Sequence, residues 1–193
     1  MNRLTRTDLL ALETYAQQRN DFRARVLTHK RPRKLHLGEH VTLIFEDRLT
    51  VQYQIQEMLR IERIFEADGI EDELAAYNPL IPDGHNLKAT LLIGFPDEEQ
   101  RRVELVRLRG IEHAIALTVQ DHAPVLAIAD EDMERSNDQK TSAVHFLRFE
   151  LDSAMIADWH AGAPITLAST LTEMTLAVAL SPEQRCALAA DFD

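Results

Sequence analysis

Alternating apolar and polar residues predict a strand over residues 40–46. Val41, Leu43 and Phe45 fall on one side of this segment, and polar side chains fall on the other. A period of two is typical of a strand that buries one face. Alternation or short apolar runs predict further strands over residues 87–95, 114–120, 125–129, 142–151, 165–168 and 174–180.

Helical periodicity and capping residues predict the helices. Thr5 and Asp8 have the spacing of a capping box, so we expect a helix over residues 7–28. The apolar period over residues 49–66 is also that of a helix, and Asp68-Gly69 is expected to end it. Further helices are predicted over residues 71–77, 97–109 and 153–160, and from Ser181 towards the C-terminus.

The order of these elements predicts an α+β fold with a mainly antiparallel sheet packed by helices. Strands come in adjacent groups instead of alternating strictly with helices, which favours antiparallel pairing. The sequence has no internal repeat and no glycine-rich linker, and 193 residues suit one domain. We therefore expect a single compact domain over residues 1–193, whose part from 153 to 193 reads helix, strand, strand, helix.

Composition narrows the class of protein. The chain is 45% hydrophobic and 27% charged, as expected for an ordinary globular protein. Its one cysteine excludes an internal disulfide and any cysteine-based zinc or iron–sulfur centre. No apolar run approaches the roughly 20 residues of a membrane span, so we expect a cytoplasmic protein with no membrane association.

Charge is unevenly distributed along the chain. Residues 1–50 carry ten Lys or Arg against six Asp or Glu, so the total of −11 leaves −15 for the remainder. The excess lies in a basic run whose members Lys30, Arg31, Arg33 and Lys34 are candidates to bind an anion or an acidic partner. The alternative is a solvated connector. Nucleic acid is not expected as the main ligand, because the acidic remainder would repel it.

Glu62 is the sharpest candidate for chemistry. At about 100° per residue it falls near the middle of a helix face that contains Val51 and Ile55. A carboxylate that faces a core must be paired, hydrogen-bonded, metal-bound or protonated. Glu62 is therefore a candidate catalytic acid or base or a metal ligand. A structural ion pair, with Arg23, Arg25 or Arg148, is the alternative.

Histidines raise the question of a metal site. His36 and His40 would lie about 13 Å apart in a strand, too far to share one ion. His145 alternates with Leu147 and Phe149, so we expect a core histidine with a hydrogen-bond partner. Glu62 with His40 or His145 is nevertheless the mixed carboxylate and imidazole set for a divalent metal such as iron, manganese or zinc.

The loop over residues 78–86 is a further candidate site. It is rich in Asn, Pro and Gly, and Lys88 lies at its edge. Loops of this kind often carry binding residues, so a small-ligand site near Lys88 is a third hypothesis.

Several segments resemble a known bacterial family. They are HVTLIFEDR at residues 40–48, YQIQEMLRIE at 53–62, YNPLIPDG at 77–84 and KTSAVHFLRFE at 140–150. Together they are similar to the family named domain of unknown function 3501, over about residues 3–152. We recognise no resemblance over the last 40 residues.

The resemblance names no activity and no catalytic residue, but it implies a genomic setting. Genes of this family are often found beside a rubrerythrin-like di-iron protein and an iron–sulfur oxidoreductase, which implies a redox or oxidative-stress task. A chain with one cysteine cannot hold an iron–sulfur cluster itself. It would therefore assist such partners and not carry the electrons.

Two functional hypotheses follow. The first is a non-catalytic cytoplasmic accessory or interaction protein of a rubrerythrin-type system, forming a homo-oligomer. The second is a metal-dependent enzyme with a carboxylate and histidine site around Glu62. The sequence does not decide between an enzyme and a binding protein.

Overall fold

Two antiparallel sheets face each other in the computed structural model, which describes residues 2–137 and 139–192. One sheet has five strands, in the order β1 (Lys34–Leu37), β2 (Val41–Glu46), β3 (Asn86–Ile93), β7 (Val144–Glu150) and β6 (Ile128–Ala129). The other has four, in the order β5 (Val125–Leu126), β4 (Ile115–Val119), β8 (Ile165–Ser169) and β9 (Leu176–Ala179).

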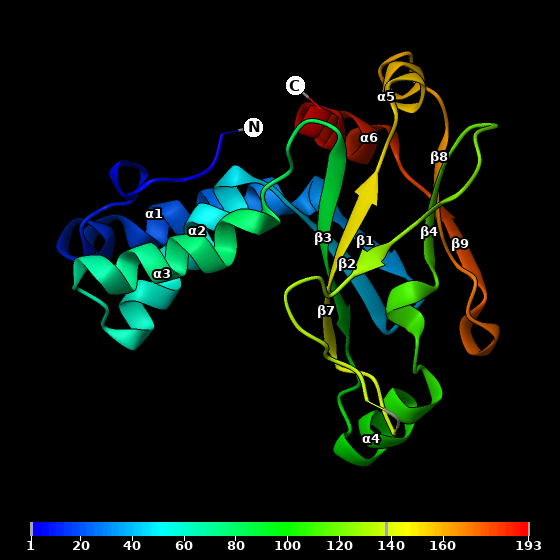
Figure 1. The fold of residues 1–193 in the computed structure, drawn as a ribbon, viewed down its shortest axis with the longest axis horizontal. Coiled ribbons are helices and arrows are strands. Elements are labelled where there is room, and N and C mark those ends of the chain that lie inside the picture. The colour runs from blue at the N-terminus through cyan, green and yellow to red at the C-terminus, as the bar shows by residue number, and fades with distance from the viewer. Residues whose placement is uncertain (1, 138, 193) are drawn as a thin grey trace.

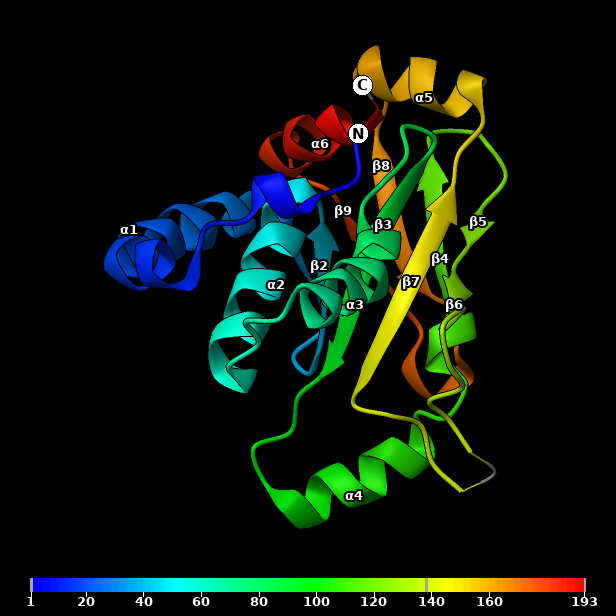
Figure 2. The ribbon, with the colours of Figure 1, turned by 60° about the vertical axis from the view of Figure 1, so that its left-hand side comes forward.

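Helices surround the two sheets on three sides (Figure 1). The helices are α1 (Leu12–Lys30), α2 (Arg48–Glu62), α3 (Ala67–Tyr77), α4 (Glu98–Arg107), α5 (Ser153–His160) and α6 (Pro182–Ala189). The first three pack together on the outer side of the five-stranded sheet, and α4 lies at the opposite end of the molecule from α5 and α6 (Figures 1 and 2). Among the described residues, no helix combines the length and apolarity needed to cross a bilayer.

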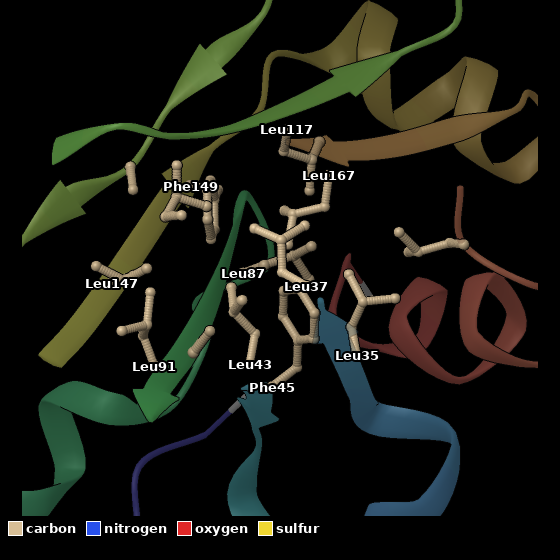
Figure 3. Packing of buried hydrophobic residues seen from close by; sticks show 14 of the residues in the cluster. Leu35, Leu37, Leu43, Phe45, Leu87, Leu91, Leu117, Leu147, Phe149 and Leu167 are labelled. Carbon is tan, nitrogen blue, oxygen red and sulfur yellow. The ribbon is translucent and has the colours of Figure 1, made fainter. Parts of the chain in front are cut away.

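The main core fills the space between the two sheets. Side chains of the five-stranded sheet, such as Leu37, Leu87 and Phe149, meet Leu117 and Leu167 of the four-stranded sheet (Figure 3). All five of these side chains are buried. Strand alternation explains this arrangement, because every second residue of a strand points to the same face.

The opposite face of the five-stranded sheet points towards α2 and α3. Along β3, the buried residues Leu87, Ala89 and Leu91 alternate with the half-buried Lys88 and Thr90. The half-buried side chains therefore line the surface between this sheet and the helices, where the candidate site lies.

The expected α+β class with antiparallel strands is confirmed, since every strand pair of the two sheets is antiparallel. The helix expected over residues 153–160 coincides with α5. After α5, the C-terminal part of the chain forms β8, β9 and α6 in this order. This part is built into the main core through Trp159, Leu167 and Leu188.

Some boundaries were wrong for local reasons. The capping box of Thr5 and Asp8 exists, but it closes a 3₁₀ turn over Arg6–Asp8, and α1 begins only at Leu12. Helix α2 ends early because Arg63 adopts a left-handed conformation with φ of 56°. The Ile64 N–H then donates to the Leu59 carbonyl at 3.0 Å, which completes a Schellman-type ending.

Three features of the fold were not predicted. Residues 68 and 69 do not end a helix but lie in the first turn of α3. Strand β1 was missed, and so was the division of the strands into two sheets. In the turn between β1 and β2, Gly38 has φ of +74°, which a residue with a side chain rarely adopts.

Candidate functional site

A pocket of about 350 Å³ lies between the end of α3 and the outer face of the five-stranded sheet. Figure 2 shows α3 running up to this sheet near β3. Tyr77, Leu80 and Phe146 supply apolar walls. Charged side chains also line the pocket, namely Glu73, Lys88, Glu131, Asp132, Arg135 and Arg148.

Strand register places two cations side by side in this pocket. Lys88 of β3 is the direct partner of Arg148 in β7 and of Glu46 in β2. Directly opposed residues of antiparallel strands have their Cβ atoms about 5 Å apart on one face of the sheet. Thr90 and Phe146 form the next row on the same face.

The arginine charges in the pocket are already neutralised. Arg148 donates to both carboxylate oxygens of Glu131, at 2.7 Å each, and also pairs with Glu150. Both of these acids belong to the sheet edge around β6 and β7. A bidentate arginine–carboxylate pair of this kind leaves little free charge for a ligand.

The charge of Arg135 is also neutralised by an acid. It donates to both oxygens of Asp132, at 2.5 and 2.6 Å, and its guanidinium lies 4.6 Å from the centre of the Phe146 ring. This contact fixes the segment after β6 against the pocket wall.

Lys88 differs from both arginines. Among the described residues, its ammonium has no hydrogen bond and no ion pair within 4 Å. Burial lowers the pKa of Lys88, and neighbouring Arg148 lowers it further, against the opposite influence of Glu131, Asp83 and Glu150. Lys88 is thus a half-buried amine that is available to a ligand.

Glu73 faces the same pocket from α3. Its Oε2 atom is buried and has no hydrogen-bond partner in the part of the chain that the structure describes. Burial raises the pKa of Glu73, and the nearby charges of Glu62 and Asp72 raise it further. A carboxyl group in this setting holds its proton more readily than an exposed one.

The pocket continues into a second hollow of about 300 Å³. The two share the apolar residues Tyr77, Leu80 and Phe146. In the second hollow, Glu46 accepts a hydrogen bond from the Thr90 hydroxyl at 2.7 Å and lies 3.9 Å from the Lys30 ammonium. The pocket and this second hollow together form a groove between the helices and the sheet, which we call the sheet–helix groove.

A buried polar network supports one wall of this groove. His145 lies 2.5 Å from Asp130 through Nδ1, and its Nε2 contacts the Thr141 hydroxyl at 2.8 Å. The Thr141 hydroxyl donates to Glu112 at 3.0 Å, and Glu112 also accepts from Ser136. Hydrogen bonds to Ser136 and Thr141 and the charge of His145 hold the pKa of Glu112 below its usual value despite burial.

The contacts among Thr141, His145 and Asp130 follow the order of a catalytic triad, but these residues are not accessible to a substrate. The Thr141 hydroxyl is committed to Glu112, and both residues are at least 97% buried. The network instead ties Asp130, Ser136 and Thr141 to β7. It thereby positions Glu131, Asp132 and Arg135 at the groove.

The predicted candidate Glu62 lies elsewhere. It is exposed at the last turn of α2, and nearby Ile61 and Phe65 are 56% and 65% exposed. The expected core-facing position of Glu62 was therefore wrong, because this side chain is exposed to solvent. Arg148, one of its expected partners, pairs with Glu131 instead.

The expected metal ligands occupy separate elements. His40 is half-buried in the turn before β2, where it stacks on Phe95 with ring centres 4.0 Å apart. His145 is fully buried in β7, as its alternation predicted. Within residues 2–137 and 139–192, no three His, Cys, Asp or Glu side chains form a group that could hold a metal ion. The structure does not bring Glu62, His40 and His145 together as such a group.

The basic run is divided between different surroundings. Arg33 is buried and donates to Asp191 at 2.5 Å and to the Phe45 carbonyl at 3.0 Å. Lys30 faces the sheet–helix groove, while Arg31 and Lys34 are exposed. Arg33 is therefore a link inside the fold and is not accessible to an outside anion.

Sequence reasoning singled out some residues of the pocket and missed others. Lys88 was singled out beside the loop over residues 78–86, but Glu73 and Phe146 were not. A signal for the strand residues existed, since Lys88 and Arg148 interrupt apolar strands on the same alternating face. No comparable signal marks Glu73, because it directly follows two other acids in α3, Glu71 and Asp72.

Comparison with known proteins gives a family. The family model described as "Protein of unknown function (DUF3501)" matches residues 3–192. The chain belongs to the DUF3501 family. The match extends the family region of about 3–152 that the sequence suggested, in agreement with the place of the last 40 residues in the DUF3501 core.

One solved structure is closely similar to this DUF3501 protein. It is the crystal structure of a novel protein of unknown function from Burkholderia pseudomallei. The two chains are 52% identical, each is covered over 100% of its length, and the TM-score is 0.95. None of the curated proteins matches this chain.

Proposed function

We propose that this DUF3501 protein is a non-catalytic binding protein for a small molecule with a carboxylate or carbonyl oxygen on a short apolar body. The observation that carries this proposal is the Lys88 ammonium, which has no protein partner among the described residues although it is half-buried beside apolar walls. A half-buried cation without a partner is less stable than a solvated one, and a ligand oxygen would offset that cost.

The dimensions and lining of the pocket support a small ligand. Pockets that bind small molecules are commonly about 300–1,000 Å³, with mostly apolar walls and a few polar groups. Here Tyr77, Leu80 and Phe146 would contact the apolar body, and Lys88 would contact the oxygen. Glu131 and Asp132 at the same pocket disfavour ligands with several negative charges.

Titration with butanoate tests this proposal. We expect butanoate to raise the melting temperature of the parent protein and to bind measurably by calorimetry, because Lys88 then gains a charged partner. Lys88→Met should weaken binding at least about tenfold, which corresponds to roughly 1.4 kcal/mol.

A matched control separates this effect from general loss of charge. Lys140→Met removes an exposed lysine outside the pocket and should leave butanoate binding unchanged. Equal affinity of the parent protein and Lys88→Met would exclude Lys88 as the binding group.

The family resemblance supports a wider role for such a binding protein. We propose that it is a cytoplasmic, homo-oligomeric accessory of a rubrerythrin-type redox system, with a rubrerythrin-like protein or an iron–sulfur oxidoreductase as partner. No contact in the described structure favours the alternative of a metal-dependent enzyme at Glu62.

Affinity purification from native cells at low salt tests the accessory role. We expect a redox protein to be retained and to dissociate as salt increases, because weakly paired surface charges are screened. Recovery of the protein without any redox partner would remove the support for this role. Light scattering of the purified protein measures its oligomeric state.

A further inference from the structure

We propose that Lys88 captures an aldehyde or ketone as an imine, with Glu73 supplying the proton that lets water leave. This inference rests on the proposed binding function of the sheet–helix groove and deepens it, because it names the carbonyl group as the part of the ligand that reacts. Nothing in the family match or in the similar crystal structure assigns such a site.

The surroundings of Lys88 are those of an amine nucleophile. A lysine attacks a carbonyl only as the neutral amine, which is favoured by desolvation and by a second cation nearby. Lys88 is half-buried, and its direct cross-strand partner is Arg148. Arg148 itself is held by Glu131 and Glu150, so it stays in place and does not compete for the carbonyl oxygen.

The carboxylates near Lys88 do not cancel the lowering of its pKa. Glu131 and Glu150 are both engaged by Arg148, and none of Glu131, Glu150 or Asp83 forms an ion pair with Lys88 in the described structure. Burial and Arg148 together outweigh these acids, so the pKa of Lys88 lies below its ordinary value.

Glu73 is placed to serve as the acid. It lines the same pocket from α3, and its buried Oε2 atom has no protein partner among the described residues. Burial together with Glu62 and Asp72 raises the pKa of Glu73, so a larger fraction of the carboxyl carries a proton than at an exposed position.

The reaction balances without an oxidant or a reductant. The Lys88 nitrogen lone pair forms a bond to the carbonyl carbon, and a proton moves from nitrogen to oxygen to give the carbinolamine. Glu73 then donates its proton to the hydroxyl, which leaves as water while the nitrogen forms a double bond to carbon. The products are a positively charged iminium on Lys88, an ionised Glu73 and one water molecule. Addition of water reverses every step, so the capture is reversible.

The apolar walls restrict the ligand class. Tyr77 and Phe146 leave room for a short aliphatic or small aromatic body beside the carbonyl. Once the iminium has formed, the ionised Glu73 offers it a counter-charge. The expected ligand is therefore a small, otherwise uncharged aldehyde or ketone.

Reductive trapping with butanal and cyanoborohydride tests the inference on the full chain. The protein has four lysines, Lys30, Lys34, Lys88 and Lys140, so three serve as internal standards. At limiting butanal we expect one butyl group per chain, located on Lys88 by peptide mapping. Lys88 should react faster than the exposed Lys34 and Lys140, since its lowered pKa leaves a larger fraction of the amine neutral.

Variants distinguish the role of Lys88 as the nucleophile from the role of Glu73 as the acid. Lys88→Arg keeps a cation in the sheet and should lose the labelling at this position. Glu73→Gln should slow trapping several-fold, and Glu71→Gln, an exposed acid on the same helix, should not slow it. Trapping of Glu73→Gln at the parent rate would show that Glu73 is not the acid.

The outcomes separate this inference from the proposed function. If butanoate binds but Lys88 is labelled no faster than Lys34 and Lys140, imine capture is wrong and the binding function stands. If neither butanoate binding nor selective labelling occurs, both proposals fail. Selective labelling of Lys88 without butanoate binding would support imine capture and overturn the carboxylate part of the binding proposal.

Discussion

Glu57 shows how one polar residue stabilises the helices that form one side of the sheet–helix groove. It lies on α2 and accepts hydrogen bonds from the Tyr15 hydroxyl at 2.7 Å and from two Arg19 nitrogens at 2.8 Å. Arg60 adds weaker contacts from the same helix. The hydrogen bonds from Arg19 and Tyr15 lower the pKa of Glu57 to about 2, despite the opposing effect of burial.

We expect Glu57→Gln to destabilise the protein by about 1–2 kcal/mol at pH 7, because hydrogen bonds to charged groups contribute more than neutral ones. The lowered pKa means that this stabilisation is complete above the ordinary value of 4.5 and is lost as the pH falls towards 2. Urea unfolding of parent and variant at pH 7 and pH 3 measures the difference.

The exposed Glu62 on the same helix provides the control. Glu62→Gln should change the unfolding free energy by less than about 0.5 kcal/mol at either pH. A difference between the parent protein and Glu57→Gln that stays constant down to pH 3 would contradict the assigned role of the Glu57 charge.

At the scale of elements, local sequence patterns predicted the helices and strands whose formation depends on residues that are close together in the sequence. The strands β2, β3 and β7 follow apolar alternation, and α5 follows a capping Asp152 that accepts from two backbone N–H groups. These features need only short-range information. Their existence and type were therefore predictable, and their ends were correct to within a few residues.

Elements whose character depends on distant partners were harder to predict. Strand β1 has only four residues and is defined by its pairing with β2. The apolar face of α2 was correctly placed at Val51 and Ile55, but its continuation to Glu62 was wrong. Periodicity tells which residues share a helix face, but it does not tell where the neighbouring surface that covers the face ends.

At the scale of the whole molecule, Arg33 links the C-terminal segment to the start of α2. Its guanidinium reaches Asp191 at 2.5 Å and lies 3.5 Å from Asp47, the residue that caps α2. The two acids respond differently to the shared cation. Asp47 also accepts from the Thr50 N–H and contacts His29, so its pKa is lowered despite burial. Asp191 has one buried oxygen without a partner in the described structure, and burial raises its pKa to about 6.

This raised pKa predicts a pH dependence opposite in sign to that of Glu57. Native Asp191 retains its proton between pH 3.8 and about 6, whereas the unfolded residue does not. The stability of the parent protein should therefore fall, relative to Asp191→Asn, by about 1–3 kcal/mol as the pH rises through this window. Urea unfolding of both proteins from pH 4 to pH 8 checks the sign.

An exposed acid near the same end of the chain is the control. Glu183→Gln in α6 should follow the pH profile of the parent protein. If Asp191→Asn also follows that profile, the Asp191 carboxyl does not change its proton affinity on folding.

The sequence by itself determined the α+β class, most of the helices and strands, the buried position of His145 and the family. These properties depend on local periodicity, capping and motif residues, which can be recognised in short segments of the sequence. Only the tertiary structure decided that Arg33 is a buried link, that Glu62 is exposed, and that Lys88 and Glu73 share a pocket. Each of these depends on which surfaces of distant segments meet, because the contact that buries, neutralises or frees a charged side chain is made across the fold.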